Sequence, residues 1–324
     1  MKNKTIFISG GTGFFGIWIL MSFIYINRKL DIGSKIILLT RDKNKFLKSY
    51  PWIEKYNEIS FLEGDIANFD FISGNIDYII HAATEASVKL NLEEPLTMFE
   101  TVVNGTKRIL EFGKIKKVKS FLLTSSGAVY GKQPSEIENI EEDYIGAPIT
   151  FDAGSVYGEG KRMSEVLCAI YHKQYNLPVK IARCYAFIGP FLPLDSHFAA
   201  GNFIKNLLEG EDLIIEGDGT PYRSYMYAAD LMIWLWTILF KGENNRPYNV
   251  GSSIPITIKE LAELVSQIDL NSPINIVLKT AESDKPPLRY VPGVNRAEKE
   301  LKLKLYTDLK KSIEKTIKFN KLQR

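Results

Sequence analysis

The sequence predicts an α/β protein in which a doubly wound parallel sheet carries helices on both faces and is followed by a smaller C-terminal domain. Three observations predict this class. The 324 residues are 45% hydrophobic and 24% charged, which is enough apolar material for a large core. Short apolar runs rich in β-branched residues alternate with stretches long enough to be helices. A glycine-rich turn follows the first of these runs.

Each predicted strand is an apolar run bounded by turn residues. Because the strands of a parallel sheet are covered on both faces, they read as continuous apolar runs rather than alternating ones. The intervening stretches have the length of crossover helices. The predicted strands cover Thr5–Ser9, Lys35–Thr40, Ile59–Leu62, Tyr78–His81, Ser120–Thr124 and Val179–Arg183.

The regular alternation of strands and helices ends after Gly189 and Pro190. Residues 1–185 are therefore predicted to form the first domain, and residues 186–324 mainly the second. Tyr248–Gly251 has the composition of a strand, and we expect it to return to the main sheet. Segments near 222–252 are accordingly expected to rejoin the first domain.

The charge pattern and the apolar runs exclude several classes of partner. Lysines and arginines number 41 against 38 acidic residues, for a net charge of +3. They are dispersed apart from a lysine-rich stretch near 299–321, and this balance predicts no nucleic-acid partner. The apolar runs Ile17–Ile26 and Leu231–Phe240 reach only about half of a membrane span, so no membrane insertion is expected.

Cysteines and histidines are few. Cys168 and Cys184 form no C-x-x-C pair, and the 3 histidines are scattered along the chain. No metal site is therefore predicted. The absence of a disulfide pattern indicates a reducing compartment, and we expect the protein in the cytoplasm.

The glycine-rich turn connects the first predicted strand to the first predicted helix. Gly10, Gly13 and Gly16 have the spacing G-x-x-G-x-x-G. Glycines here permit a tight turn and let the backbone approach a pyrophosphate, while the helix N-terminus attracts phosphate. A purely structural turn is the alternative, but the context of strand, turn and helix favours dinucleotide binding. The predicted contacts are Gly10, Thr12, Gly13, Phe14, Phe15 and Gly16.

The end of the second strand discriminates between two dinucleotides. Arg41 precedes Asp42 at this point. An arginine accommodates the extra phosphate of NADP, whereas an acidic residue bonds the ribose hydroxyls of NAD. We favour NADP as the cofactor, with NAD as the alternative if Asp42 occupies the ribose site. After the third strand, Asp65 and Ile66 are predicted to border the cofactor, although Asp65 could also be a plain turn residue.

Three residues are predicted to carry the chemistry. Tyr157 and Lys161 are four residues apart and therefore share one face of a helix. A lysine close to a tyrosine favours the phenolate and lowers the pKa of the phenol, so that it can exchange a proton with a hydroxyl or carbonyl group. Ser126 follows the strand Ser120–Thr124, at the carboxyl edge where such sheets bind ligands.

Together these segments resemble the extended short-chain dehydrogenase/reductase superfamily, in its branch of NAD(P)-dependent nucleotide-sugar epimerases, dehydratases, decarboxylases and reductases. The resemblance covers essentially the whole chain. It implies a Rossmann-type sheet with a smaller C-terminal substrate-binding domain. The matching segments are the glycine turn, Gly64-Asp65-Ile66, His81-Ala82-Ala83, Gly105-Thr106, the Ser126 segment, Tyr157 with Lys161, Arg183 with Gly189-Pro190, and Gly217-Asp218-Gly219 through Arg223 to Asp230.

The resemblance also implies residue roles. Tyr157 is expected to be the acid/base, Lys161 to orient the nicotinamide ribose, and Ser126 to hydrogen-bond the reacting oxygen. Related enzymes commonly form homodimers through four helices, which here contain residues near 96–112 and 157–175. Ala82, Ala83 and Thr84 are expected to lie against the cofactor.

Other positions are expected to contact the substrate. Asn202, Arg223 and Arg289 match positions that hold the diphosphate or nucleoside of a sugar nucleotide, and an arginine binds phosphate oxygens with two parallel hydrogen bonds. A surface ion pair is the alternative for each arginine. Glu85 and Ser87 follow the fourth strand and are expected to face the sugar, or alternatively to cap a helix.

Departures from the family pattern reduce the number of reactions that this chain is expected to catalyse. Gly127 and Ala128 stand where 4,6-dehydratases have Asp-Glu, and neither residue can transfer a proton. Decarboxylases of UDP-glucuronate usually carry Glu at the position of Ala128. Many 4-epimerases carry Asn in the segment Tyr185-Ala186-Phe187, and another asparagine of the family is replaced by Val102.

The sequence therefore predicts an NAD(P)-dependent oxidoreductase that reduces a 4-keto sugar nucleotide by hydride transfer. The alternative is a nucleotide-sugar 4-epimerase that holds NAD tightly, because epimerases regenerate their cofactor whereas reductases consume NADPH. A decarboxylase, a 4,6-dehydratase and a non-catalytic dinucleotide sensor are less favoured. The product would be a modified sugar for a polysaccharide or glycoconjugate.

Overall fold

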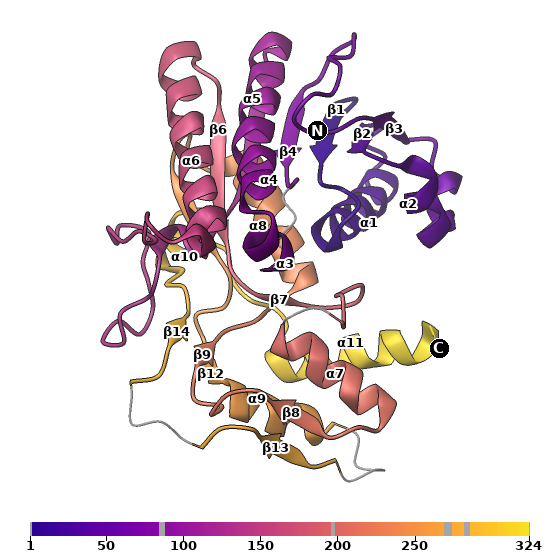
Figure 1. The fold of residues 1–324 in the computed structure, drawn as a ribbon. Coiled ribbons are helices and arrows are strands. Elements are labelled where there is room, and N and C mark those ends of the chain that lie inside the picture. Colours follow the sequence, from indigo (N-terminus) through magenta and orange to yellow (C-terminus); the bar gives the residue numbers. More distant parts are fainter. Residues whose placement is uncertain (1, 84–87, 196–197, 269–273, 282–285, 324) are drawn as a thin grey trace. The chain divides into compact units, whose positions relative to one another are not determined.

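The computed structural model describes residues 2–83, 88–195, 198–268, 274–281 and 286–323 (Figure 1). The chain divides into two compact units. The first unit contains Met1–Gly131, Ala147–Arg183 and Leu235–Tyr248. The second contains Lys132–Gly146, Cys184–Trp234 and Asn249–Arg324.

A parallel sheet organises the first unit. Among the described residues it has 7 strands in the order β11-β6-β5-β4-β1-β2-β3. Strand β1 pairs with both β2 and β4, with Ile8 opposite Leu38 on one side and Ile80 on the other. The direction of winding therefore reverses between β1 and β4, and ligands bind outside the carboxyl ends of the strands at such a point. The strands are β1 (Thr5–Ser9), β2 (Lys35–Thr40), β3 (Ile59–Glu63), β4 (Tyr78–His81), β5 (Ser120–Ser126), β6 (Val179–Cys184) and β11 (Pro247–Val250).

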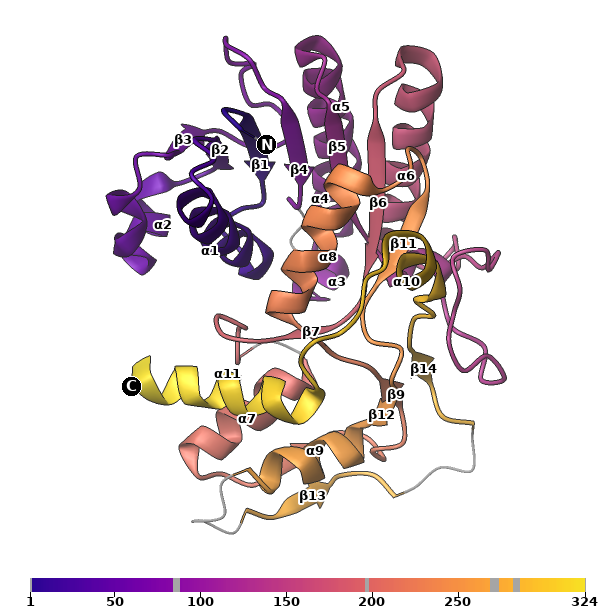
Figure 2. The same cartoon turned by 180° about the vertical axis from the view of Figure 1, so that it is seen from behind.

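Helices cover both faces of this sheet, as the two opposite views show (Figure 1 and Figure 2). Helices α5 (Gly105–Lys116) and α6 (Val156–Tyr175) lie side by side on one face. On the other face lie α1 (Phe14–Lys29) and α8 (Ala228–Lys241), linked by Trp236, whose Nε1 donates to Ser22 Oγ at 2.9 Å. The remaining helical segments before α8 in this unit are α2 (Lys43–Ser49), η1 (Pro51–Lys55), α3 (Val88–Glu93), α4 (Pro95–Phe99), the π-helix η2 (Glu100–Asn104), η3 (Gly127–Tyr130) and η4 (Ala153–Ser155).

Aromatic side chains fill the core between α5 and the sheet. Phe7 of β1 is fully buried, and its ring centroid lies 5.6 Å from that of Phe69 and 5.0 Å from that of Phe112. Large buried rings of this kind each remove about 150–250 Å² from water. This packing holds α5 against the sheet.

The second unit is built from short strands and amphipathic helices. Phe203, Leu261 and Ile313 come from different helices and share one buried apolar cluster. Thr257 and Glu260 form a capping box that starts α9. The helices are α7 (Ala199–Glu209), α9 (Ile258–Ser266), α10 (Asn295–Leu301) and α11 (Leu309–Gln323), and the strands are β7 (Phe187–Ile188), β8 (Leu213–Ile215), β9 (Tyr222–Arg223), β10 (Met226–Tyr227), β12 (Ile256–Thr257), β13 (Ile276–Leu278) and β14 (Arg289–Tyr290).

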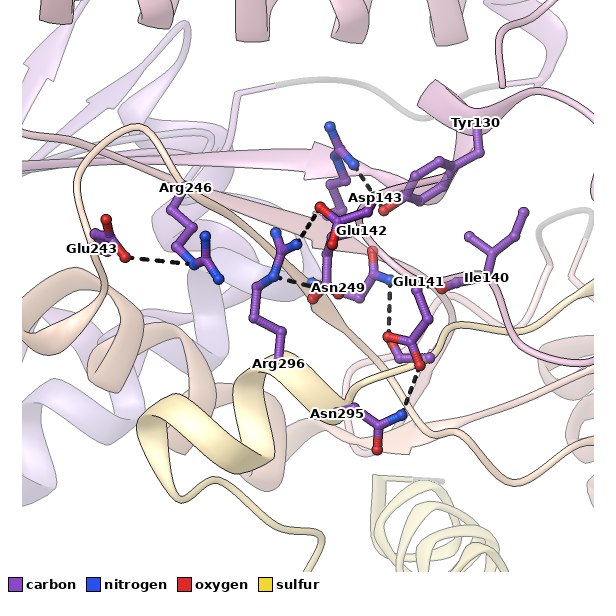
Figure 3. A network of polar contacts seen from close by, with 12 residues as sticks. Tyr130, Ile140, Glu141, Glu142, Asp143, Glu243, Arg246, Asn249, Asn295 and Arg296 are labelled. Atoms are coloured by element: carbon purple, nitrogen blue, oxygen red, sulfur yellow. Dashed lines mark hydrogen bonds and ion pairs between the residues drawn. The ribbon is translucent and has the colours of Figure 1, made fainter. Parts of the chain in front are cut away.

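A buried polar network holds the segment 132–146 within the second unit (Figure 3). Asn249 Nδ2 donates to the carbonyls of Ile140 and Gly293, at 2.8 and 2.9 Å, and its backbone N–H donates to Glu142. Arg296 pairs with Asp143 at 2.6 Å and with Glu142 at 3.8 Å. Burial raises the pKa of Glu142 against the opposing effect of Asn249 and Arg296. The network ties this loop to the start of α10.

The predicted fold class is confirmed. The strands lie where the apolar runs predicted them, and Tyr248 belongs to the returning strand β11. The paired short strands of the second unit were not predicted, because two or three residues are too few to show a period. Within the described residues, no helix combines the length and the apolar character that a membrane crossing requires.

Candidate active site

The glycine turn lies at the carboxyl end of β1, where the winding of the sheet reverses. Gly10 has φ +74°, and a Cβ there would lie 2.3 Å from the backbone of Ala82. A Cβ on Gly16 would lie 2.0 Å from the backbone of Gly11. Glycine is therefore required at both positions by the protein's own backbone.

Gly13 differs from these two glycines. It has φ −91°, an ordinary value, and a Cβ would meet only the carbonyl oxygen of Gly10, at 4.0 Å. Packing within the described residues therefore does not require glycine here. Gly13 is the N-cap of the 16-residue helix α1, whose first turn contains no acidic residue. A glycine at a helix N-terminus that the described packing does not require fits close approach of a dinucleotide's pyrophosphate to the backbone.

The residues that follow β2 and β3 are held by local hydrogen bonds. Asp42 caps α2, with its Oδ1 accepting from Lys45 N at 2.8 Å. Asp65 Oδ1 accepts from Ala67 N at 2.9 Å in an Asx turn. Arg41 directly follows β2 and precedes the capping aspartate. The first residue beyond the strand is thus a cation, while the Asp42 carboxylate is used by its own helix.

Ser126 ends β5 and begins η3. Its Oγ accepts a hydrogen bond from the backbone N–H of Ala128 at 3.1 Å. This bond uses a lone pair of the oxygen and leaves the hydroxyl proton for another acceptor. The rotamer of Ser126 is thereby set before any ligand binds.

Tyr157 and Lys161 lie on the first two turns of α6. The backbone N–H of Tyr157 donates to Asn91 Oδ1 at 3.0 Å, which ties the start of this helix to α3. Lys161 is 2% exposed, its Nζ donates to the carbonyl of Thr124 at 2.8 Å, and the same nitrogen lies 5.9 Å from the centre of the Tyr157 ring. A buried ammonium group beside the phenol is the arrangement that proton transfer by tyrosine requires.

Gly158 brings the Tyr157 turn onto the Ser126 segment. A Cβ at Gly158 would lie 2.9 Å from the carbonyl oxygen of Ala128 and 2.8 Å from Cγ of Pro148. No larger residue fits this approach. The close contact places the helix that carries the phenol directly against the turn that carries the serine hydroxyl.

A buried ion pair connects α6 to strand β6 of the sheet. Arg183 of β6 donates to both carboxylate oxygens of Glu165 on α6, with Nη2 at 2.7 Å, and its Nη1 donates to Tyr130 OH at 2.8 Å. Ser125 Oγ donates to Glu165 at 2.5 Å. Burial opposes the charge of Arg183, but the hydrogen bonds and charge of Glu165 outweigh burial and raise the pKa of the guanidinium. We call Ser125, Tyr130, Glu165 and Arg183 the α6 clamp.

Ala82 and Ala83, which directly follow β4, lie at the same edge. Ala82 N donates to the carbonyl of Ser9 at 2.9 Å, so the segment beginning at Ala82 runs beside the glycine turn. Ala83 follows it, and Ile66 packs against Gly105 at the start of α5. Thr84, Glu85 and Ser87 lie outside the described residues.

The predicted contacts of the diphosphate and nucleoside belong to the second unit. Arg223 is on β9 and Arg289 on the adjacent strand β14, with Arg289 opposite Tyr222 in the register. The Arg289 guanidinium lies 4.3 Å above the Tyr222 ring. Neither arginine forms an ion pair with the residues that the structure describes, so the alternative of a surface ion pair is not observed there. Asn202 lies on α7 and is exposed.

Sequence reasoning missed the α6 clamp, Asn91 and the role of Gly158. One signal was available for Glu165, because it follows Lys161 by four residues and shares its helix face. Its partner Arg183 comes from a separate strand, and no local spacing predicts that pairing.

Comparison with known proteins identifies the family. Residues 6–251 match the model of the NAD dependent epimerase/dehydratase family. The chain belongs to this family. It is 32% identical over 301 residues to UDP-glucuronic acid decarboxylase 5 of Arabidopsis thaliana, covering 93% of this chain and 84% of that protein. The resemblance to NAD(P)-dependent enzymes of this kind is thus confirmed, and a nicotinamide dinucleotide is the cofactor typical of the family.

Solved structures of the family share the fold. UDP-N-acetylglucosamine 4-epimerase from Methanobrevibacter ruminantium matches with a TM-score of 0.84 at 22% identity, covering 100% of both chains. UDP-glucose 4-epimerase from Thermotoga maritima matches with a TM-score of 0.82 at 22% identity, covering 98% of this chain and 99% of that one. A dTDP-glucose 4,6-dehydratase from Bacillus anthracis matches at 0.81, with 22% identity over 99% of this chain and 97% of that one. At these identities the likeness concerns the fold.

Proposed function

We propose that this enzyme reduces a 4-keto sugar nucleotide by hydride transfer from NADPH. The observation that carries the proposal is the joint placement of Ser126, Tyr157 and buried Lys161 at the carboxyl edge of the sheet, beside the glycine turn. Membership of the family supports a nucleotide sugar as the substrate.

The chain's own residues supply binding and proton transfer. Ser126 donates a hydrogen bond to the keto oxygen and keeps its proton, and the bond from Ala128 N to one of its lone pairs orients the hydroxyl for this. Tyr157 gives its phenolic proton to that oxygen as it becomes a hydroxyl, and Lys161 stabilises the phenolate that remains. When bound, the reduced nicotinamide supplies the hydride. The reaction takes up one hydride and one proton, and the ketone becomes an alcohol.

The choice of NADPH rests on the residues after β2. Asp42 is committed to capping α2, whereas Arg41 follows the strand directly. A guanidinium binds a phosphate monoester through strong charge-assisted hydrogen bonds. This arrangement favours a cofactor with a 2′-phosphate.

A reductase also agrees with the turn after Ser126. Gly127 and Ala128 carry no acidic group, and Glu159 on the neighbouring helix pairs with Arg162 at 3.6 Å. Dehydration and decarboxylation would need a proton-transfer group that this turn does not contribute. The similarity to decarboxylases therefore supports the substrate class more strongly than it supports their reaction.

A second candidate is a 4-epimerase with tightly bound NAD. It is supported by the epimerases among the solved relatives, and it would use the same serine, tyrosine and lysine.

On the substrate side, we propose that Arg223, Arg289 and Asn202 bind the nucleoside diphosphate. Glu85, Ser87 and Thr84 remain proposed contacts of sugar or cofactor.

The first experiment identifies the dinucleotide. Freshly purified protein is denatured and the released compounds are analysed by mass; if none is released, NADPH and NADH are titrated in parallel. An empty site that prefers NADPH, together with oxidation of NADPH by a 4-keto-6-deoxy sugar nucleotide, is the expected result. Stoichiometric bound NAD, with interconversion of UDP-glucose or UDP-glucuronic acid epimers, would replace the reductase by the epimerase. Release of carbon dioxide from UDP-glucuronic acid would overturn both.

We also propose that the enzyme is a homodimer through α6 and α4–α5. Met163, Val166 and Ile170 are 44%, 49% and 40% exposed and recur at helical spacing on one face of α6. Exposed Phe99 and Leu96 extend the apolar surface of the same unit. Cys168 and Cys184 are both buried and form no disulfide, which agrees with the proposed cytoplasmic location.

A further inference from the structure

A chain of buried polar side chains connects the glycine turn to the catalytic helix. Ser9 Oγ lies 2.7 Å from Nδ1 of His81, and Nε2 of His81 lies 3.0 Å from Oγ1 of Thr106. Thr106 Oγ1 lies 3.0 Å from Oγ of Ser164 on α6. All four residues are at most 1% exposed. We call them the His81 chain.

The short contacts assign the protons in this chain. Thr106 Oγ1 is 2.6 Å from the carbonyl of Val102 and must donate its single proton there, since two acceptor oxygens do not approach so closely without one. Thr106 can then only accept from His81, so the imidazole carries its proton on Nε2. Nδ1 is left as the acceptor for the Ser9 hydroxyl. The π-helix η2 presents the Val102 carbonyl to this point.

Both ends of the chain reach predicted functional groups. Ser9 precedes Gly10, whose missing Cβ lets it lie on the backbone of Ala82, the residue after His81. At the other end Ser164 Oγ lies 3.0 Å from Thr106 Oγ1 and 2.9 Å from the carbonyl oxygen of Gly160, the residue before Lys161, and its single proton is shared between these two acceptors. The His81 main chain contributes as well, because Thr124 Oγ1 donates to its carbonyl at 3.2 Å and Lys161 donates to the Thr124 carbonyl.

The protonation state of His81 excludes a direct acid/base role at neutral pH. Burial, reinforced by the charge of Lys161, lowers the pKa of His81 to about 3. The ring is therefore neutral throughout the physiological range. Its two nitrogens are both engaged by hydroxyl groups, one on each side.

We propose that His81, as a neutral imidazole protonated on Nε2, is a positioning residue that couples the glycine turn to the helix carrying Tyr157 and Lys161. The inference rests on the proposed function, because it assigns dinucleotide binding to the turn and proton transfer to the helix. Binding at the turn and the orientation of the catalytic pair are then linked through one side chain.

Three substitutions at position 81 separate its two links. His81→Phe removes both hydrogen bonds, His81→Gln places an amide donor toward Thr106, and His81→Asn places an acceptor toward Ser9. We expect His81→Phe to lower kcat about 10- to 100-fold and to weaken dinucleotide binding, since a small displacement of reacting groups has effects of this size. His81→Gln keeps the link to Thr106 and should recover most of kcat but not the dinucleotide affinity. His81→Asn keeps the link to Ser9 and should recover the dinucleotide affinity but not kcat. His172→Gln, on the far end of α6, is the matched control and should match the wild type in both.

A mutant cycle tests the coupling. Ser9→Ala and Ser164→Ala alter residues that do not touch each other, so their effects on the Kd of NADPH should add if they are independent. If His81 couples the two sites, the effects of the two serine substitutions should be non-additive when residue 81 is histidine. They should be additive in the His81→Gln and His81→Asn backgrounds. Additivity in the wild type would overturn the proposal.

A spectroscopic measurement needs no ligand or turnover. The sequence contains 3 histidines, so spectra of ¹⁵N-histidine-labelled protein can be assigned with His81→Gln and His172→Gln. The signals of His81 should show the neutral ring protonated on Nε2 and should not change between pH 5 and 8. Titration of this ring near 6.5, or the opposite tautomer, would overturn the inference even in an inactive protein. Failure of the wild type to bind NADPH or NADH would instead reject the proposed function.

Discussion

At the scale of single residues, the position of Tyr157 is set by contacts of the backbone. Its backbone N–H donates to Asn91, and Gly158 packs its turn against Ala128. Tyr157→Phe should therefore keep the fold and the Kd of the dinucleotide while lowering kcat about 100- to 10,000-fold, the range of general acid/base catalysis. Steady-state kinetics and dinucleotide titration measure the two effects. Tyr171→Phe, on the same helix, is the control and should retain turnover; turnover retained in Tyr157→Phe would reject the mechanism.

Substitutions of Arg41 and Asp42 are expected to affect the choice of cofactor differently. Loss of a charged hydrogen bond in Arg41→Ala should raise the Kd of NADPH by roughly 10- to 100-fold and leave that of NADH unchanged. Asp42→Asn, which still caps α2, should change neither. Fluorescence titrations of both variants with both cofactors test this. Weaker NADH binding in Asp42→Asn would place the aspartate at the ribose and favour the NAD-dependent epimerase.

His81 also predicts a pH dependence of stability. Its pKa in the folded protein is lowered from 6.5 to about 3, so the unfolded chain binds a proton more readily than the native state. The contribution to stability is fully present above pH 6.5 and is lost as the pH falls toward 3, at up to about 1.4 kcal/mol per pH unit. The free energy of unfolding, measured with urea at several pH values between 7 and 4, should fall less steeply with decreasing pH for His81→Gln than for the wild type. Equal slopes would contradict this assignment.

At the scale of elements, the α6 clamp determines how the catalytic helix lies on β5 and β6. Arg183 and Glu165 are 14% and 13% exposed, whereas Arg162 and Glu159 pair on the same helix with side chains that are 41% and 32% exposed. Glu165→Ala leaves a buried guanidinium without its carboxylate and should lower the free energy of unfolding by about 3–5 kcal/mol. Glu159→Ala should change it by less than about 1 kcal/mol. Similar values for the two variants would show that the clamp contributes no more than a surface pair.

At the scale of the whole molecule, the exposed face of α6 makes the homodimer testable. Val166→Glu places a charge in the middle of the row formed by Met163 and Ile170, and burying an unpaired charge in an interface is strongly unfavourable. Sedimentation velocity should show a dimer for the wild type and a monomer for Val166→Glu. Ile254→Glu changes another exposed apolar residue, 69% exposed in the second unit, and should stay dimeric. A monomeric wild type would reject the dimer.

The sequence by itself determined the sheet, the glycine turn and the spacing of the catalytic pair. Continuous apolar runs predicted β1 to β6, because a strand that is covered on both faces consists of consecutive apolar residues. The i, i+4 spacing placed Tyr157 and Lys161 on one helix face in the same way. These patterns depend only on residues close together in the chain.

The tertiary structure alone decided the partners of these residues. Arg183 meets Glu165 across 18 positions, and His81 lies between Ser9, 72 positions away, and Thr106, 25 positions away. Strand order and register determine which distant side chains share a buried space, and neither can be read from local spacing. A buried polar group must find a hydrogen-bond partner, but only the packed sheet and helices determine which residue that partner is.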